Sequence, residues 1–259
     1  MQNGLLLGAI ISSTDAAAVF AILRRRGVSL KGDLKPLLEL ESGSNDPMAI
    51  FLTAGMTQVL TVPDFAWERL FPGFVMSMSC GAVMGLAAGK LASFLFNRIH
   101  LDNEGLYPVL STSLVVLTFG ATEQLHGNGF LAVYLCGMMM NGSDFAYKRS
   151  VLRYHDGLAW LMQITMFVVL GLLVFPSQLR AIAVTAMLVT LFLMFVARPA
   201  AVAVCLWGSV FSWRERMLVA WTGLRGAVPI VLATIPLTAN YANSDTVFNV
   251  VFFIVVTSV

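Results

Sequence analysis

Charged residues are scarce in this sequence. They make up 12% of its 259 residues, whereas hydrophobic residues make up 58%. A soluble globular domain has about 25% charged and about 45–50% apolar residues, and the mean hydropathy here is +0.81. The composition therefore excludes an ordinary soluble domain and is typical of a membrane protein. The net charge of +2 is too small to indicate a nucleic-acid partner.

Cysteine and histidine are also rare, with three residues of each. Cys80, Cys136 and Cys205 all lie within apolar runs, where we interpret each thiol as a small buried helix residue. No group of cysteine and histidine has the spacing of metal ligands. The sequence therefore gives no indication of a Cys/His metal site.

Long apolar runs fill most of the chain. A membrane-spanning helix needs about 20 residues, and backbone groups in hydrocarbon must be hydrogen-bonded within the protein. The runs are continuous and do not alternate as the strands of a membrane barrel do. We therefore expect an all-α, polytopic helix bundle. The predicted helical segments are 4–23, 37–60, 73–96, 107–122, 129–142, 155–175, 181–207, 217–236 and 247–259.

Both ends of the sequence lie close to apolar runs. No basic leader of a signal peptide precedes the first run, and the last run, "VVFFIVVTSV", is too short to span a membrane. We therefore expect a fragment of a longer membrane protein, with further helices beyond both ends.

Basic residues are distributed unevenly between the two sets of loops. Because Lys and Arg are enriched in cytoplasmic loops, the richer set, 24–36, 97–106, 143–154 and 208–216, is predicted to be cytoplasmic. The other set contains only Arg69 and Arg180. The richer set contains Arg24, Arg25, Arg26, Lys31, Lys35, Arg98, Lys148, Arg149, Arg153, Arg214 and Arg216.

Asp15, Glu41, Asp46 and Arg225 stand out among the ionisable side chains inside the predicted spans. Such a residue costs about 2.5–3.5 kcal/mol on membrane-insertion scales, and it is a candidate functional residue for that reason. Arg198 precedes Pro199 near a predicted cytoplasmic helix end, where its long side chain could reach the membrane surface.

The stretch "ESGSND" places the acids on different faces of one helix. Ser42 and Asp46 are four residues apart and share a face, and Glu41 and Asn45 form a neighbouring stripe. Asp46 and Ser42 offer oxygen ligands for a small cation. Glu41 is predicted to pair with Arg225, because a buried arginine needs a partner. The alternative is that Arg225 binds carbonyl groups at a helix end.

Two of the predicted spans are interrupted. The polar "SSTD", which includes Thr14 and Asp15, lies within 4–23, and glycine and proline residues break 217–236. Short polar side chains compete for backbone hydrogen bonds and favour a bend. Broken helices in distant parts of one chain suggest inverted repeats that cross at the ion site of a transporter.

One further pattern concerns helix packing. Gly81, Gly85 and Gly89 are spaced four residues apart in segment 73–96 and share one face. Because glycine lets two backbones approach closely, we expect another helix to pack against this face.

Three motifs in this order, "SSTDAAAVF", "ESGSNDPMAIF" and "GLRGAVPI", resemble the monovalent cation:proton antiporters of the sodium/proton exchanger kind. Within that family the bacterial NhaP type, with its potassium/proton antiporter branch, is the most similar. The resemblance covers nearly the whole chain and implies inverted repeats, two crossing broken helices and a mobile core that moves against a dimerisation domain. It implies that 1–60 and 181–259 belong to the core bundle, 73–96 is a connecting helix and 107–175 forms dimer-interface helices.

The resemblance also implies roles for individual residues. Asp46 would bind the cation or the proton, with Asp15 as a nearby acid. The family often has proline after the "TD" pair, whereas this chain has Ala16, so the shape of that break stays open. The implied cation- and proton-binding set is Asp46, Asp15, Thr14, Ser42 and Asn45, and the implied ion pair is Glu41 with Arg225.

We therefore expect a secondary active antiporter in which K+ or Na+ competes with H+ at Asp46. The pair "ND", Asn45–Asp46, resembles the electroneutral branch. The bound metal would be a monovalent cation, and no cofactor is needed because the proton gradient drives the cycle. We expect a multi-pass protein in the lipid bilayer of a bacterial inner (plasma) membrane, a homodimer, and no nucleic-acid partner.

Three alternatives remain at this point. A cation channel would need a pore ring or a filter loop, and none is evident. An intramembrane enzyme would need a base near its acids, whereas His100, His126 and His155 lie near segment ends. A purely structural subunit would carry costly buried acids without using them.

Overall fold

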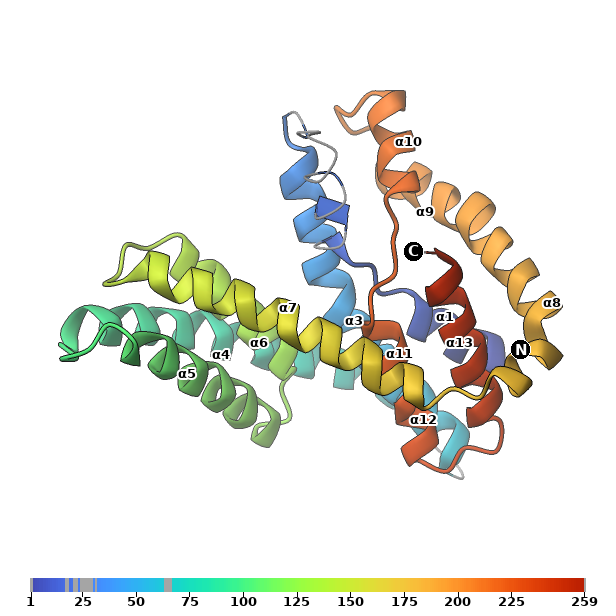
Figure 1. Cartoon of the computed structure of the whole chain (residues 1–259), viewed down its shortest axis with the longest axis horizontal. Helices are drawn as coiled ribbons and strands as arrows, with labels where there is room; N and C mark the ends of the chain where they lie inside the picture. The colour runs from blue at the N-terminus through green and yellow to red at the C-terminus, as the bar shows by residue number, and fades with distance from the viewer. Residues whose placement is uncertain are drawn as a thin grey trace. The chain divides into compact units, whose positions relative to one another are not determined.

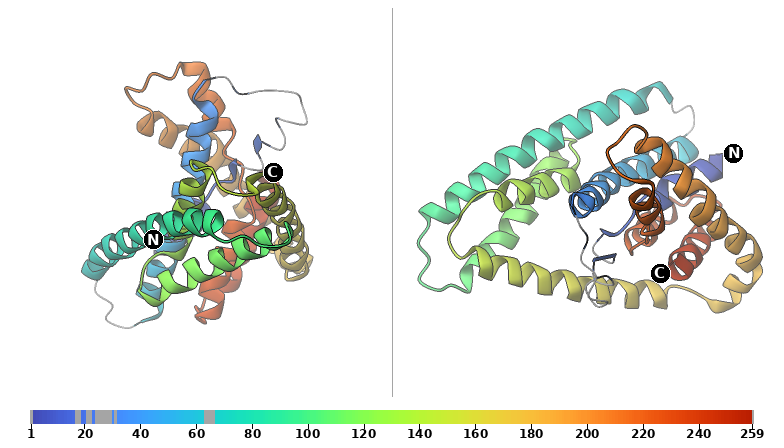
Figure 2. Two further views of the ribbon diagram at one scale, coloured as in Figure 1. Left: turned by 90° about the vertical axis from the view of Figure 1, so that its left-hand side faces the viewer. Right: turned by 90° about the horizontal axis from the view of Figure 1, so that it is seen from above.

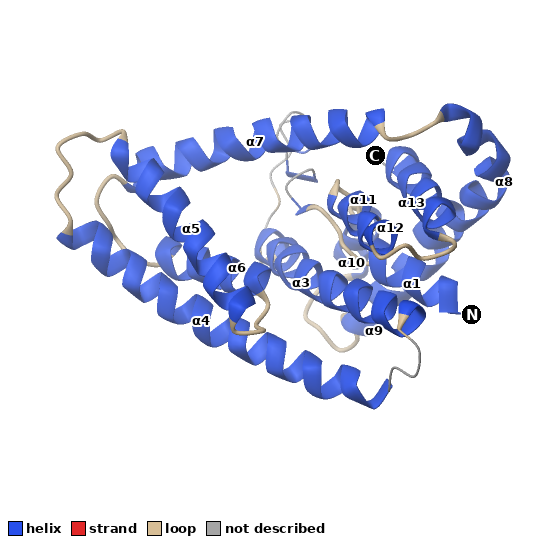
Figure 3. Cartoon of the chain, turned by 90° about the horizontal axis from the view of Figure 1, so that it is seen from below, coloured by secondary structure: helices blue, strands red, loops and turns tan. Residues whose placement is uncertain are grey.

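We describe the fold from a computed structural model, which describes residues 2–16, 19–20, 23, 30, 32–62 and 67–258. Over these residues every regular element is a helix, and no strand is present (Figure 3). The all-α prediction is therefore confirmed. The elements are α1 (Gln2–Ile11), α3 (Leu34–Thr61), η1 (Trp67–Arg69), α4 (Leu70–Arg98), α5 (Leu106–Gln124), α6 (Gly129–Asn141), α7 (Lys148–Leu172), α8 (Pro176–Phe192), η2 (Leu193–Ala197), α9 (Arg198–Cys205), α10 (Trp213–Trp221), α11 (Val228–Leu232), α12 (Thr234–Thr238) and α13 (Ser244–Ser258).

The chain divides into two compact units. The first, which we call the discontinuous unit, joins Met1–Phe65 to Val169–Val259, and the second, the central unit, is Ala66–Val168. In Figure 1 the central unit contains α4, α5, α6 and most of α7, drawn from teal to yellow. Each unit is described separately below.

The discontinuous unit brings the N-terminal and C-terminal parts of the chain together. Helix α1 packs on α3, α11 and α13, and α13 also packs on α8. Fully buried side chains from both ends of the sequence, including Leu6, Ile10, Ile230 and Ile254, form its interior. Segments far apart in the sequence therefore depend on each other to remove their apolar surface from solvent.

The central unit is built around close contact between α4 and α6. Both views of Figure 2 show α4 beside the antiparallel pair α5 and α6. A Cβ atom added at Gly81, Gly85 or Gly89 would lie only 2.6, 2.5 or 2.6 Å from atoms of Asn128, Ala132 or Met139, respectively. The predicted packing role of this glycine stripe is therefore confirmed.

Three helices of the described chain are long and apolar enough to cross a membrane, at Leu70–Arg98, Leu106–Gln124 and Ile182–Cys205. Helix α1 ends at Ile11, and α10 ends at Trp221 before α11 begins at Val228. The predicted spans 4–23 and 217–236 are thus broken, as expected from their polar and glycine-containing stretches. Helix α7 begins at Lys148, seven residues before the predicted start at 155. Its first turns contain basic residues, which are good helix formers.

Candidate functional site

Two irregular segments meet inside the discontinuous unit. One follows α1 and contains Asp15, and the other lies between α10 and α11 and contains Leu224 and Arg225. The Asp15 backbone N–H donates to the carbonyl oxygen of Leu224 at 2.9 Å, and Arg225 Nε donates to the carbonyl oxygen of Ile11 at 3.2 Å. A Cβ at Gly226 would lie 2.5 Å from Asp15 Oδ2, so the close approach requires glycine there. The two helix breaks thus contact each other directly.

Helix α3 presents polar side chains to the first of these breaks. Ser42 Oγ donates to the Thr14 carbonyl oxygen at 3.0 Å, and Asn45 Nδ2 donates to Thr14 Oγ1 at 2.6 Å. Ser13 Oγ donates to Asp46 Oδ1 at 2.5 Å. The structure therefore brings together the predicted Thr14, Ser42, Asn45 and Asp46, and it adds Ser13.

We had not assigned Ser13 a role in the site, although it belongs to the polar "SSTD" stretch. Its side chain is 1% exposed, whereas the neighbouring Ser12 is exposed. A buried hydroxyl needs a hydrogen-bond partner, and here the partner is Asp46. The signal in the sequence was the position of Ser13 within the predicted break. Whether Ser12 or Ser13 points inward depends on the residue at which α1 ends.

One oxygen of this cluster has no donor within the described part of the protein. Asn45 Oδ1 is buried and lacks a hydrogen-bond partner there, because Asn45 uses its amide nitrogen toward Thr14. A buried acceptor without a partner is unfavourable unless water or an ion satisfies it. Together with the Asp46 carboxylate, it offers the all-oxygen environment that alkali and other hard cations prefer.

Asp15 directly follows Ser13 and Thr14 in the first break and contacts the second break. Its carboxylate lies against Gly226, and it is near enough to Asp46 for their like charges to repel each other. Two carboxylates in such an arrangement favour the uptake of one positive charge, either a proton or a cation.

The ion pair of Glu41 differs from the prediction. Both terminal nitrogens of Arg198 bind the two carboxylate oxygens of Glu41, the Nη2–Oε2 pair at 3.0 Å. Nη2 also donates to the carbonyl oxygen of Val219 at 3.3 Å. Glu41 therefore pairs with Arg198 and not with Arg225. The Arg198 side chain is engaged by this pair, whereas we had suggested that it extends outward.

The physical reason lies in the helix ends. The last carbonyl groups of a helix have no partner within it, and Ile11, the last residue of α1, is satisfied by Arg225. The alternative prediction for Arg225, that it binds carbonyl groups at a helix end, is the one that the structure shows. Arg198 starts α9 directly after the π-helical turn η2, and its side chain contacts Glu41 on α3.

Space around Arg198 is provided by glycine and by a small cavity. A Cβ at Gly223 would lie 2.5 Å from Arg198 Nε. Arg198, Gly223, Arg225 and Ser258 line a cavity of about 30 Å³, which is enough for a water molecule. Arg198 Nε is buried and has no hydrogen-bond partner within the described residues. A water molecule in this cavity could accept a hydrogen bond from it.

Comparison with known proteins relates the whole chain to one family. The family described as sodium/hydrogen exchanger, transmembrane, matches residues 1–259. The K(+)/H(+) antiporter NhaP of Alkalimonas amylolytica is 43% identical over 257 residues, and the K(+)/H(+) antiporter NhaP2 of Shewanella baltica is 39% identical over 259 residues. Each match covers 99% of this chain and 44% of the relative, so the chain spans less than half the length of these relatives.

A solved structure shares the fold. The sodium proton antiporter MjNhaP1 from Methanocaldococcus jannaschii, determined at pH 8, matches with a TM-score of 0.81 and 24% sequence identity. The match covers 100% of this chain and 69% of that chain. The predicted fold, a membrane helix bundle with broken helices that cross, is therefore confirmed.

Proposed function

Because this chain belongs to the sodium/hydrogen exchanger family, we propose that it is part of a secondary active antiporter that exchanges a monovalent cation for protons across the membrane. The observation that carries the proposal is the cluster of oxygens around the half-buried Asp46, in which the buried Asn45 Oδ1 has no donor within the described protein. The NhaP and NhaP2 relatives are named as K(+)/H(+) antiporters, so K+ is the first cation to test and Na+ the second.

Exchange would follow from competition at one carboxylate. Asp46 would hold either a proton or a cation. Each would neutralise the negative charge of Asp46, which is repelled by the negative charge of Asp15. Hydrogen bonds to Thr14 connect the first break to α3, which carries both Ser42 and Asp46. Thr14 and Ser42 would therefore move together with Asp46. A single exchangeable positive charge per cycle corresponds to electroneutral exchange, with one proton for one cation.

The other residues would position this cluster. Arg198 joins α3 to α9 through Glu41 and to α10 through the Val219 carbonyl group. Arg225 joins the second break to the end of α1. These contacts would make the two breaks and α3 move as one body when the site changes sides.

The two units would have different roles in transport. We propose that the discontinuous unit, which contains the cluster, is the mobile core bundle, and that the central unit contributes the connecting helix and dimer-interface helices. The assembled protein would be a homodimer in a bacterial inner membrane. These assignments rest on the family and on the division of contacts within the chain.

The proposal can be tested in vesicles that contain the purified full-length protein. With an imposed pH gradient, addition of K+ or Na+ should release protons from the wild-type vesicles. Asp46→Asn should abolish this response, because the side chain keeps its shape but no longer titrates. Glu39→Gln on the exposed face of α3 is the matched control and should behave as wild type.

Wild-type proton movement in the Asp46→Asn variant, at equal protein content, would reject the proposed role. Cation flux without any proton counterflow would instead indicate a channel.

A further inference from the structure

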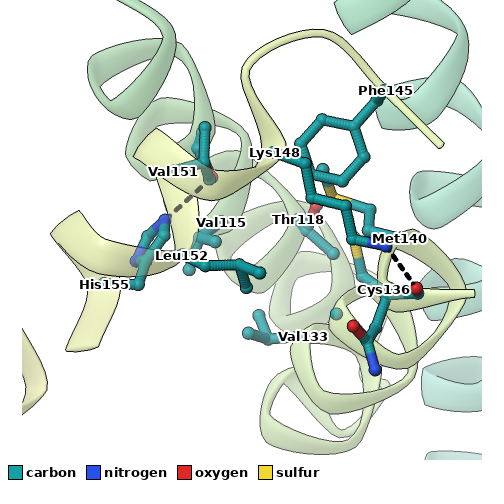
Figure 4. Close-up of a pocket in the computed structure, with 13 residues that line it drawn as sticks. Val115, Thr118, Val133, Cys136, Met140, Phe145, Lys148, Val151, Leu152 and His155 are labelled. Atoms are coloured by element: carbon teal, nitrogen blue, oxygen red, sulfur yellow. Dashed lines mark hydrogen bonds between the residues drawn. The ribbon is translucent and has the colours of Figure 1, made fainter. Parts of the chain in front are cut away.

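A second cavity lies within the central unit, away from the Asp46 cluster in the sequence. It has a volume of about 250 Å³ and lies between α5, α6 and the first half of α7 (Figure 4). Its lining includes Val115 from α5, Val133 and Met140 from α6, and Val151 and Leu152 from α7. The body of the cavity is therefore apolar.

The cavity lining also contains two hydrogen-bonded polar groups, the Ser111–His155 pair and the Lys148 ammonium group. Ser111 Oγ and His155 Nε2 form a 2.8 Å hydrogen bond between α5 and α7. Lys148 Nζ donates to the carbonyl oxygens of Asn141 and Ser143 at 2.6 and 3.0 Å, at the carboxyl end of α6. In Figure 4 the Lys148 ammonium group points toward the end of α6, beside Met140 and Cys136.

The chain itself leaves this space open. A Cβ added at Gly137, which lines the cavity, would meet no atom within 4 Å. The cavity opens to the surface of the unit, because Gly137, Asn141 and Leu152, which line it, are exposed. Apolar surface of this kind is unfavourable in water and favourable against hydrocarbon. A 250 Å³ cavity between helices of a membrane protein therefore favours hydrocarbon as its occupant.

The charge at the cavity edge indicates which amphiphile fits. Within the described residues, the ion pairs are Lys35–Glu39 and Glu41–Arg198, so Lys148 has no carboxylate partner there. An ammonium group has three N–H donors, and two are accounted for by carbonyl groups. The exposed Arg149 and Arg153 follow in the same stretch, which the distribution of basic residues assigns to the cytoplasmic side.

We propose that this cavity binds an acyl chain of an anionic phospholipid from the cytoplasmic leaflet, with the lipid phosphate beside Lys148. Basic pockets between membrane helices at the cytoplasmic side are suited to such headgroups. The apolar walls would accept the chain, and the third N–H of Lys148 would donate to the phosphate.

The test uses the purified full-length protein in detergent, with no added lipid at the start. Phosphatidylglycerol and phosphatidylcholine with identical acyl chains are titrated separately, and binding is followed by native mass spectrometry and by the rise in Tm. Gly137→Leu fills the cavity, and Lys148→Gln removes the charge. Gly120→Leu, at an exposed site on α5 with no atom near its Cβ position, and Arg149→Gln are the matched controls. Inorganic phosphate is a third titrant.

We expect selective binding of phosphatidylglycerol by the wild type and by both controls. Lys148→Gln should weaken it about fivefold, which corresponds to about 1 kcal/mol for one basic residue at the membrane surface. Gly137→Leu should abolish it. Equal binding of the two lipids, wild-type affinity in Lys148→Gln, or an equal effect of inorganic phosphate would overturn the proposal. Because the readouts are binding and Tm, the result does not depend on transport.

Discussion

Arg198 and Glu41 are separated by 157 positions in the sequence, yet the two terminal nitrogens of the arginine bind the two oxygens of the carboxylate. The side chains are 16% and 25% exposed, respectively. The pair joins the helix that carries Asp46 to the helices that precede the second break. It therefore fixes the position of α3 against a part of the chain that is distant in sequence.

Removal of either partner of this pair should destabilise the protein, because the remaining charge would be left without a counter-ion in a largely apolar surrounding. We expect Glu41→Gln and Arg198→Gln each to lower the free energy of unfolding by about 3 kcal/mol. The double variant should lose less than the sum of the two single losses. Thermal unfolding of the four proteins of this cycle measures the coupling.

The same cycle with Arg225→Gln in place of Arg198→Gln serves as the control. Arg225 donates to a carbonyl group and not to Glu41, so its effect should simply add to that of Glu41→Gln. Strong coupling of Glu41 to Arg225, with none to Arg198, would show that the pairing described here is wrong.

Ser13→Ala should weaken cation-dependent exchange. The hydroxyl donates to Asp46 Oδ1, and a hydrogen bond to a charged group is worth about 1.5–3 kcal/mol. We expect the apparent affinity for the transported cation to fall by about tenfold or more. The measurement is the cation concentration that gives half-maximal proton release, which should rise by that factor. Ser12→Ala is the matched control, because Ser12 is exposed and donates to the Ala9 carbonyl group instead. Equal effects of the two substitutions would contradict a specific role for Ser13.

Gly226→Ala should separate the two helix breaks. The new Cβ would lie 2.5, 2.8 and 3.0 Å from Oδ2, Cβ and Cγ of Asp15, and overpacking of this kind costs about 1–3 kcal/mol. We expect a lower Tm together with loss of exchange. Gly8→Ala in α1, where a Cβ meets no atom within 4 Å, should leave both unchanged. Normal Tm and exchange in the Gly226→Ala variant would mean that the breaks do not approach as described.

The start of α10 should respond to acid through Glu215, which lies in the predicted cytoplasmic loop. The backbone N–H of Ser212 donates to Glu215 Oε2 at 2.7 Å, the Ser212 hydroxyl donates to the same oxygen at 2.8 Å, and these hydrogen bonds hold the pKa of Glu215 below its usual range. Because the pKa is lowered in the folded state, the stabilisation is complete above the pKa of the unfolded chain. It is lost as the pH falls through the lowered value.

Hydrogen exchange across α10, corrected for the intrinsic effect of pH, measures this loss. Protection of the first turn should fall in acid in the wild-type protein. In Glu215→Gln, which cannot ionise, protection should show no such pH dependence. A matching acid response in both proteins would assign it to another group.

Sequence reasoning found the parts of the site that lie along one helix. The four-residue spacing of Ser42 and Asp46 in "ESGSND" was sufficient to predict that they share one face, because helix periodicity is local. Asn45 was included in the predicted site only through the family resemblance. The polar "SSTD" stretch likewise predicted the end of α1. Both inferences need only neighbouring residues.

Partners between distant segments were harder to predict. Two arginines, Arg198 and Arg225, were available for Glu41, and the choice depends on how the breaks and η2 place each side chain. Ser13 was missed for a similar reason, since Ser12 and Ser13 are equivalent in sequence and differ only in which one faces α3. The start of α7 was placed too late because polarity was taken as a sign of a loop, whereas basic residues are good helix formers.

The π-helical turn η2, at Leu193–Ala197, makes chain length itself a constraint on the protein. Each residue added to or removed from an α-helix rotates everything beyond it by about 100°. Deletion of a single apolar residue within Leu193–Ala197 would therefore leave the hydropathy of the span almost unchanged while turning Arg198 away from Glu41. This part of the chain should accept exchange of one apolar residue for another far more readily than the loss or gain of a single position.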